Sequence, residues 1–181
     1  MKNLRALTAA AFIALVVGHS FAAESKFAKV KIINSNRQEV GEATLSETPN
    51  GVLIRFNLRP KPDGISSGPH AMHIHDVGKC EPPFKSAGEH FNPFNKKHGF
   101  FGKDGKHLGD LPNIYMPESA ALTVEFLVPQ LSLGGGVTSV FDSNGSALVI
   151  HQGPDDYNTD PAGNSGDRVA CGVIERSGQA N

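Results

Sequence analysis

The 181-residue sequence contains no tryptophan, only two cysteines and no strong excess of charge of either sign. Its 17 basic and 18 acidic side chains give a formal net charge of −1, which argues against a nucleic-acid-binding protein, because such proteins carry a basic surface. Charged residues make up only 19% of the chain and hydrophobic residues 39%, which is too apolar for a disordered protein. Beyond the N-terminal 22 residues, no segment reaches the roughly 20 apolar residues of a membrane-spanning helix. The sequence therefore predicts neither a nucleic-acid partner nor a membrane partner.

The first 22 residues have the pattern of a secretory signal peptide. Two basic residues precede an apolar stretch over 6–18, and small residues follow near position 22. We therefore expect a cleaved signal peptide over 1–22, a mature domain over 23–181 and a periplasmic location. A buried N-terminal helix is the alternative, although the segment has no cap and no polar face. Because the signal carries two basic and no acidic residues, the mature chain has a net charge of −3.

Export determines how the two cysteines are interpreted. In an oxidising compartment, Cys80 and Cys171 are predicted to form a disulfide, and two buried free thiols are the alternative. The disulfide would close a loop of about 91 residues and would stabilise the fold by at most roughly 4–5 kcal/mol in the chain-entropy model.

Alternation of apolar and polar residues predicts short strands over most of the remaining chain. Asn50-Gly51 between two such segments favours a tight hairpin, and 20 glycines with 12 prolines fit a protein of strands and turns. The expected strands are 26–34, 40–45, 52–58, 70–75, 120–128, 146–151 and 168–175. With no convincing helical period, the sequence predicts an all-β, Greek-key antiparallel barrel or sandwich of about eight strands. Two long loops, 78–112 and 153–167, are expected to be functional.

Histidine is unusually frequent, and seven of the eight histidines lie between positions 70 and 151. His73 and His75 are two apart on an expected strand, so both side chains point to one face. The rest of the chain adds five candidate ligands, which are His90, His98, His107, Asp110 and His151. Imidazole binds copper and zinc, and a carboxylate suits zinc, so these residues predict two metal ions or one ion with bystander side chains. His70 is out of register with the pair, and we expect it to make a structural hydrogen bond.

Together these segments resemble the copper/zinc superoxide dismutases. In chain order, the matching motifs are GPHAMHIH at 68–75, SAGEHFNP at 86–93, KHG at 97–99, HLGDL at 107–111, VIH at 149–151, DD at 155–156 and GNSGDRVACGVI at 163–174. Each motif alone is weak or moderate. Their common order and spacing along nearly the whole mature chain is highly specific.

The resemblance implies one copper and one zinc ion per chain. It implies the copper ligands His73, His75, His90 and His151, and the zinc ligands His90, His98, His107 and Asp110. His90 would then bridge the two ions. The resemblance also implies that Asp155 links ligands of both metals, that Arg168 is the cation beside copper, and that Cys80–Cys171 is the family's disulfide.

The activity that the resemblance implies is dismutation of superoxide. Two superoxide radicals and two protons become oxygen and hydrogen peroxide through alternate reduction and oxidation of copper, with His90 and Arg168 in catalytic roles. Superoxide is thus the expected small-molecule partner. Bacterial members of the family associate in different ways, so a homodimer is an alternative to a monomer.

Two other functions are alternatives to this activity. An exported copper- or zinc-binding storage or chaperone domain would share the ligands, but storage needs no cation such as Arg168 to guide an anion. A zinc hydrolase would need a catalytic glutamate, and Glu89 is expected to point away from the histidines.

The sequence departs from many relatives in the loop before Arg168. Within 157–166 the only charged residue is Asp160, and Ala162 stands where relatives often have threonine. Lysines of the long metal loop could attract the anionic substrate instead, and a solvated charged loop is the alternative. These lysines are Lys79, Lys85, Lys96, Lys97, Lys103 and Lys106.

Overall fold

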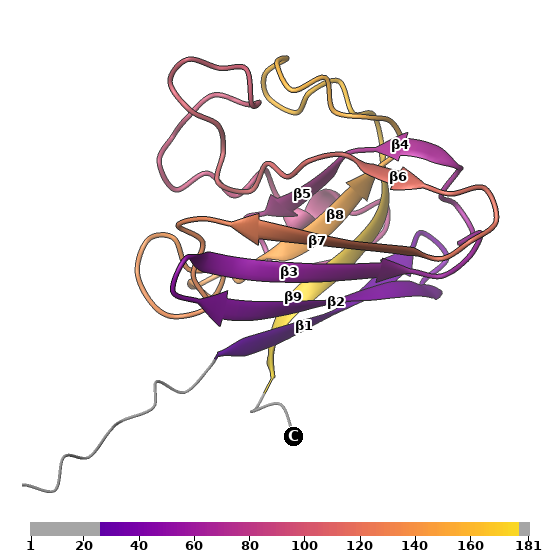
Figure 1. Cartoon of the computed structure of the whole chain (residues 1–181), viewed down its shortest axis with the longest axis horizontal. Coiled ribbons are helices and arrows are strands. Elements are labelled where there is room, and N and C mark those ends of the chain that lie inside the picture. The colour runs from indigo at the N-terminus through magenta and orange to yellow at the C-terminus, as the bar shows by residue number, and fades with distance from the viewer. Residues whose placement is uncertain (1–25, 178–181) are drawn as a thin grey trace, which may run out of the picture.

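The computed structural model describes residues 26–177, which contain nine strands and one short 3-10 helix (Figure 1). The strands are β1 (Phe27–Asn34), β2 (Glu39–Thr48), β3 (Gly51–Leu58), β4 (Gly68–His70), β5 (Met72–His75), β6 (Ile114–Met116), β7 (Leu122–Val128), β8 (Ala147–His151) and β9 (Arg168–Ser177). The 3-10 helix, η1, is Lys85–Ala87. The predicted signal peptide, 1–22, lies outside the described residues. Within those residues, no helix is long and apolar enough to cross a membrane.

Seven strands form one curled antiparallel sheet in the order β5-β8-β9-β1-β2-β3-β7. β4 and β6 pair separately as a two-stranded sheet. The first strand pairs with the last, and β3 pairs with β7 across the long intervening segment. This order is that of a Greek-key barrel, as the sequence predicted.

The alternation of side chains explains why these segments form strands. In β1, Ala28, Val30 and Ile32 face the core, whereas Lys29 and Lys31 face solvent. β5 and β8 differ because they are buried at every position. Phe84 and Ala87 pack on β8 in a small cluster apart from the main core, and His90 bridges to His75 of β5. This part of the sheet therefore has apolar or functional side chains on both sides.

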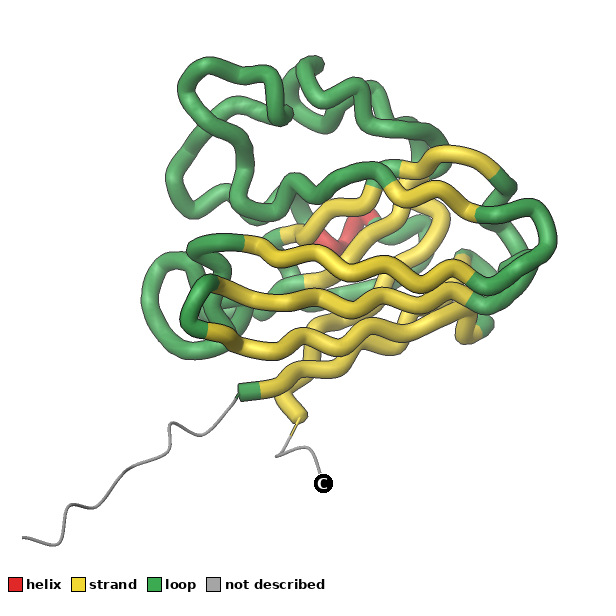
Figure 2. The backbone as a smooth tube through the Cα atoms, viewed as in Figure 1, coloured by secondary structure: helices red, strands yellow, loops and turns green. Residues whose placement is uncertain are grey.

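The two predicted loops emerge on the same side of the barrel and lie beside each other (Figures 1 and 2). Hydrogen bonds join them, from the Phe101 N–H to the Tyr157 carbonyl oxygen and from the His98 N–H to the Asp160 carboxylate. Both loops are irregular as predicted, except for η1 in the first. The loops therefore form a second layer over β5 and β8, and the candidate ligands lie between these layers.

Two details differ from the sequence-based expectation. The predicted strand 70–75 is interrupted at Ala71, so β4 and β5 belong to different sheets. β6 was not predicted, because a strand of three residues is too short to display an alternation.

Candidate metal centre

Backbone pairing gathers the first group of histidines. His73 and His75 lie on β5, which pairs with β8, and His151 is the last residue of β8. His90 in the long loop forms an isolated antiparallel bridge with His75. Loop and sheet thus bring four histidines, each at most 5% exposed, to one place.

Four imidazole nitrogens at this place have no hydrogen-bond partner. They are His73 Nδ1, His75 Nε2, His90 Nε2 and His151 Nε2, and in the described residues the only other buried side-chain atom without one is Ser146 Oγ. One nitrogen from each histidine lies within 4.8 Å of the others. Buried polar atoms without partners are costly, and a metal ion that accepts imidazole nitrogen would satisfy all four at once.

In three of these histidines, the other ring nitrogen makes a hydrogen bond that fixes the orientation of the ring. His73 Nε2 donates to Asp155 Oδ2 at 2.9 Å, His75 Nδ1 donates to the Gly88 carbonyl oxygen at 3.1 Å, and His151 Nδ1 lies 3.3 Å from the Gly166 carbonyl oxygen. A donor on one nitrogen leaves the lone pair on the other, which faces the cluster.

Burial keeps these imidazoles neutral. Desolvation lowers the pKa of His73 to about 4, although the hydrogen bond that His73 donates to Asp155 acts in the other direction. Desolvation and the charge of His73 lower the pKa of His151 to about 3, and desolvation holds the pKa of His75 well below its usual range. Neutral imidazole is the form that binds a metal.

Asp110 organises a second cluster. Its Oδ1 lies 2.8 Å from His90 Nδ1, 3.1 Å from His98 Nδ1 and 3.3 Å from His107 Nδ1. Its Oδ2 accepts the backbone N–H groups of Gly99 and His107. Burial would raise the pKa of Asp110, but hydrogen bonds from the three imidazoles outweigh burial and hold it well below its usual range. Three imidazoles and one carboxylate form a four-ligand set that suits zinc.

His90 belongs to both clusters. Its Nε2 is one of the four nitrogens without a partner, and its Nδ1 faces Asp110. One imidazole therefore separates two candidate ion positions.

Asp155 hydrogen-bonds to one histidine of each cluster. Its carboxylate accepts from His73 Nε2 and from His98 Nε2, each at 2.9 Å. Although burial disfavours the charged form of His98, its bonds to Asp110 and Asp155 raise its pKa to about 9. Gly163, at φ +64°, permits this arrangement, since a Cβ there would overlap the Asp155 carboxylate.

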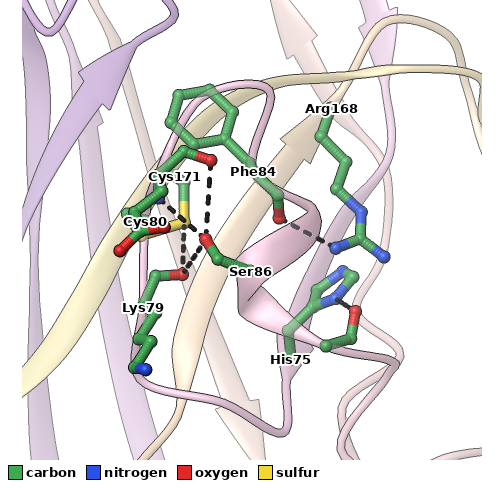
Figure 3. Close-up of a disulfide and its surroundings, with 9 residues drawn as sticks. His75, Lys79, Cys80, Phe84, Ser86, Arg168 and Cys171 are labelled. Atoms are coloured by element: carbon green, nitrogen blue, oxygen red, sulfur yellow. Dashed lines mark hydrogen bonds between the residues drawn. A yellow bond between two sulfur atoms is a disulfide. The ribbon is translucent and has the colours of Figure 1, made fainter.

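A surface cavity of about 920 Å³ opens beside the first cluster. Arg168, Lys85, Glu89 and Asp167 all line it. Of the six lysines that the sequence offered as anion attractors, Lys85 is the one among its lining residues. The Arg168 guanidinium lies next to His75 (Figure 3), and its positive charge contributes to the lowered pKa of that histidine, after desolvation and His90.

Cys80 and Cys171 form a disulfide with a Cα–Cα distance of 5.6 Å, as the even cysteine count and the expected export predicted. The disulfide joins the long metal loop to β9 three residues after Arg168 (Figure 3). His70 also has the expected structural role. Its Nδ1 contacts the His151 carbonyl oxygen at 2.8 Å and its Nε2 contacts the Ser66 carbonyl oxygen at 2.9 Å.

The structure thus brings together every candidate ligand that the sequence offered. Sequence reasoning missed the backbone acceptors that hold the site, namely the carbonyl oxygens of Phe84, Gly88 and Gly166. No sequence signal could have found them, because every residue type carries a carbonyl group.

A curled Greek-key sheet with two adjoining clusters, one of four histidines and one of three histidines and an aspartate, defines a class of two-metal proteins. Comparison with known proteins identifies that class. Residues 39–174 match the family model described as copper/zinc superoxide dismutase (SODC). The chain therefore belongs to the copper/zinc superoxide dismutase family.

Individual relatives agree with this assignment. The chain is 46% identical over 176 residues to Cu-Zn superoxide dismutase 2 of Aquifex aeolicus, which covers 96% of this chain and 99% of that protein. It is 42% identical over 142 residues to the Cu-Zn superoxide dismutase of Caulobacter vibrioides, covering 76% and 79%. The crystal structure of a double mutant of a SOD-like protein from Bacillus subtilis matches at 38% identity with a TM-score of 0.75, covering 80% and 95%. The protein is a superoxide dismutase that binds copper and zinc.

Proposed function

We propose that the four-histidine cluster holds copper and that the cluster around Asp110 holds zinc. The copper ligands are His73 Nδ1, His75 Nε2, His90 Nε2 and His151 Nε2. The zinc ligands are the Nδ1 atoms of His90, His98 and His107 with Asp110 Oδ1. The observation that carries the copper assignment is the convergence of four buried nitrogens without partners. The carboxylate in the other set supports zinc there.

Catalysis requires the metal ions and two side chains, those of His90 and Arg168. When bound, copper supplies one-electron reduction and oxidation, which redox-inert zinc does not. The first superoxide would give up one electron at the copper site and leave as oxygen, and His90 Nε2 would then exchange its bond to the ion for a proton from solvent while its Nδ1 stays with the zinc cluster. The second superoxide would take up that electron, the proton from His90 and a further proton from solvent, and would leave as hydrogen peroxide.

Arg168 attracts and orients the anion. Its planar guanidinium lines the cavity next to His75 and offers paired N–H donors to superoxide. Lys85 adds a second positive charge to the cavity, whereas Glu89 and Asp167 bring two negative charges. The formal charge of these four side chains is therefore zero, so attraction depends on the position of the cations. Focusing of this kind raises association rates by roughly 10- to 10³-fold.

Export through a cleaved signal peptide over 1–22 to the periplasm is the location that we propose for the mature domain, 23–181. The basic and apolar N-terminal sequence and the Cys80–Cys171 disulfide support it, because disulfides persist in oxidising compartments. For the association state we propose a homodimer, in which exposed apolar side chains such as Tyr115 on β6 and Leu127 on β7, 67% and 51% exposed, would be covered. Sedimentation at micromolar concentration tests this association, and a monomer would contradict it.

Metal analysis of purified, reconstituted protein, paired with a dismutation assay, tests the ligand assignment. The intact chain should bind one copper and one zinc. His98→Ala should lose zinc and bind copper more weakly, because the shared His90 loses its neighbouring ion. Lys97→Ala, at the adjacent exposed position, serves as the control and should retain both ions. Full occupancy of both sites in His98→Ala would remove His98 from the zinc ligands.

A further inference from the structure

Lys106 differs from the other five lysines that the sequence offered as anion attractors. It is half-buried, whereas the other five are exposed. Its ammonium group lies against the chain, where Nζ donates to the Asp110 carbonyl oxygen at 2.7 Å and to the His107 carbonyl oxygen at 3.0 Å. Both acceptors belong to proposed zinc ligands, at the two ends of the turn 107–110. The charge of Lys106 is therefore directed toward the zinc cluster and not toward solvent.

The turn 107–110 is attached to the barrel through its middle. The Gly109 carbonyl oxygen accepts from the Ile74 N–H of β5 at 2.9 Å, and the Gly109 N–H donates to the Phe91 carbonyl oxygen at 2.8 Å. Glycine is required at this position, since a Cβ would overlap the Ile74 carbonyl oxygen. These bonds fix the middle of the turn, whereas the two ligands lie at its ends.

The ends of the turn are joined to each other and to Lys106. The Asp110 N–H donates to the His107 carbonyl oxygen at 3.2 Å, so this oxygen accepts from both the turn and the ammonium group. Asp110 is 1% exposed, and a buried carbonyl group needs a donor. Lys106 supplies that donor through a charge-assisted hydrogen bond. One ammonium group thus connects the first and last residues of the turn.

Aromatic rings hold Lys106 from the other side. Its Nζ lies 5.1 Å from the centroid of the Phe100 ring, within the range of a cation–π contact. The Phe100 ring meets the edge of the Tyr157 ring at a centroid distance of 5.1 Å, and the Tyr157 hydroxyl accepts the Asn113 N–H at 2.7 Å. The ammonium group therefore lies between the turn and a ring that the second loop keeps in place.

We infer that Lys106 is a positioning residue for the zinc ligands His107 and Asp110. By joining both ends of the turn, its ammonium group sets where the imidazole and the carboxylate begin. This inference rests on the zinc site proposed above. A cation also repels a zinc ion, so removal of Lys106 would strengthen zinc binding if the residue acted through its charge alone. Positioning and repulsion therefore predict opposite signs for its removal.

Zinc affinity of the copper-loaded protein, measured with a competing chelator, separates the two effects. Lys106→Met keeps the length of the side chain but removes its charge and its donors. It should weaken zinc binding about tenfold, at the lower end of the effect of residues that orient metal ligands, because the repulsion is lost as well. Lys103→Met makes the same change of charge at an exposed position of the same loop and should not weaken zinc binding. If Lys106→Met does not fold, Lys106→Gln takes its place with the same expected direction.

The visible spectrum of cobalt gives a second readout, which a loss of stability alone would not change. Copper is kept as Cu⁺ and the zinc ion is replaced by Co²⁺, whose absorption depends on the geometry of its ligands. Lys106→Met should shift this spectrum, and Lys103→Met should leave it unchanged. Lys106→Arg keeps the charge and several N–H donors, so it should return zinc affinity to within about threefold of the wild type.

Three results would overturn this role of Lys106. The first is a zinc affinity of Lys106→Met that equals or exceeds that of the wild type. The second is a weaker affinity with an unchanged cobalt spectrum, because ligand geometry would then not depend on this residue. The third is a loss in Lys106→Arg as large as in Lys106→Met, because charge and donors would then not account for the loss. Zinc affinity that is unchanged in Asp110→Ala would instead refute the proposed zinc site itself.

Discussion

The stability of the metal-free protein should depend on pH in a way that reports the buried histidines. His98 is 2% exposed and hydrogen-bonds to two carboxylates, Asp110 through Nδ1 and Asp155 through Nε2. Burial alone would lower its pKa, but these two bonds raise it to about 9 from an ordinary value of 6.5. The folded protein therefore retains a proton on His98 at pH values where the unfolded chain has lost it.

The sign and size of the alkaline effect follow from this difference. The stabilisation from His98 is fully present below pH 6.5 and is lost as pH rises through about 9. A pKa difference of this size corresponds to about 3 kcal/mol of unfolding free energy. That is a large share of the 5–15 kcal/mol typical of a folded domain.

On the acid side, other histidines produce the opposite slope. Burial lowers the pKa of His73 to about 4 and that of His151 to about 3, so the folded protein excludes protons that the unfolded chain binds below pH 6.5. Stability should therefore also fall as pH drops from 6.5 toward 4. The two slopes together predict a maximum near pH 6.5.

Urea unfolding in the presence of a chelator, repeated from pH 5 to 9.5, measures this dependence. His98→Asn is the control, and it should lose the alkaline slope while keeping the acid one. A midpoint that stays constant or rises between pH 6.5 and 9.5 would refute the reasoning about His98 and its two carboxylates.

Three further predictions concern other parts of the site. Asp155→Asn should weaken zinc binding roughly 10- to 100-fold in chelator competition, as for other residues that orient metal ligands. The control is Asp156→Asn, at the exposed neighbouring position, which should not weaken zinc binding. Equal zinc affinities of Asp155→Asn and the wild type would remove Asp155 from this role. Cys80→Ser/Cys171→Ser should lower the unfolding free energy by up to roughly 4–5 kcal/mol in denaturant titration, and an unchanged midpoint would contradict a stabilising disulfide. Lys85→Glu should slow dismutation at low salt and have less effect at high salt, because the screening length falls below about 10 Å above 0.1 M; a salt-independent effect would mean that Lys85 does not act through its charge.

The strands could be predicted because their burial alternates. β1 and β3 each place apolar side chains on one face at every second residue, and that period is visible in the sequence. β6 has three residues and shows no period. Ala71 separates β4 from β5 through tertiary pairing with different strands, and no local pattern records this separation.

The candidate ligands could be identified from the sequence because their side chains carry the chemistry. His73, His98 and Asp110 are recognisable as candidate ligands by residue type, order and spacing. The contacts that orient the site are different, since the Phe84 carbonyl group depends on a backbone angle and on burial in a small cluster. The selection of Lys85 from six lysines likewise depends on where a loop folds, which the charge pattern does not determine.

The most direct test of the account is a crystal structure of the reconstituted protein with anomalous diffraction measured at the copper and zinc absorption edges. The account predicts a copper peak among His73 Nδ1, His75 Nε2, His90 Nε2 and His151 Nε2. It predicts a zinc peak beside Asp110 Oδ1, with His90 between the two ions. A single ion, or copper beside Asp110 with zinc among the four histidines, would contradict it.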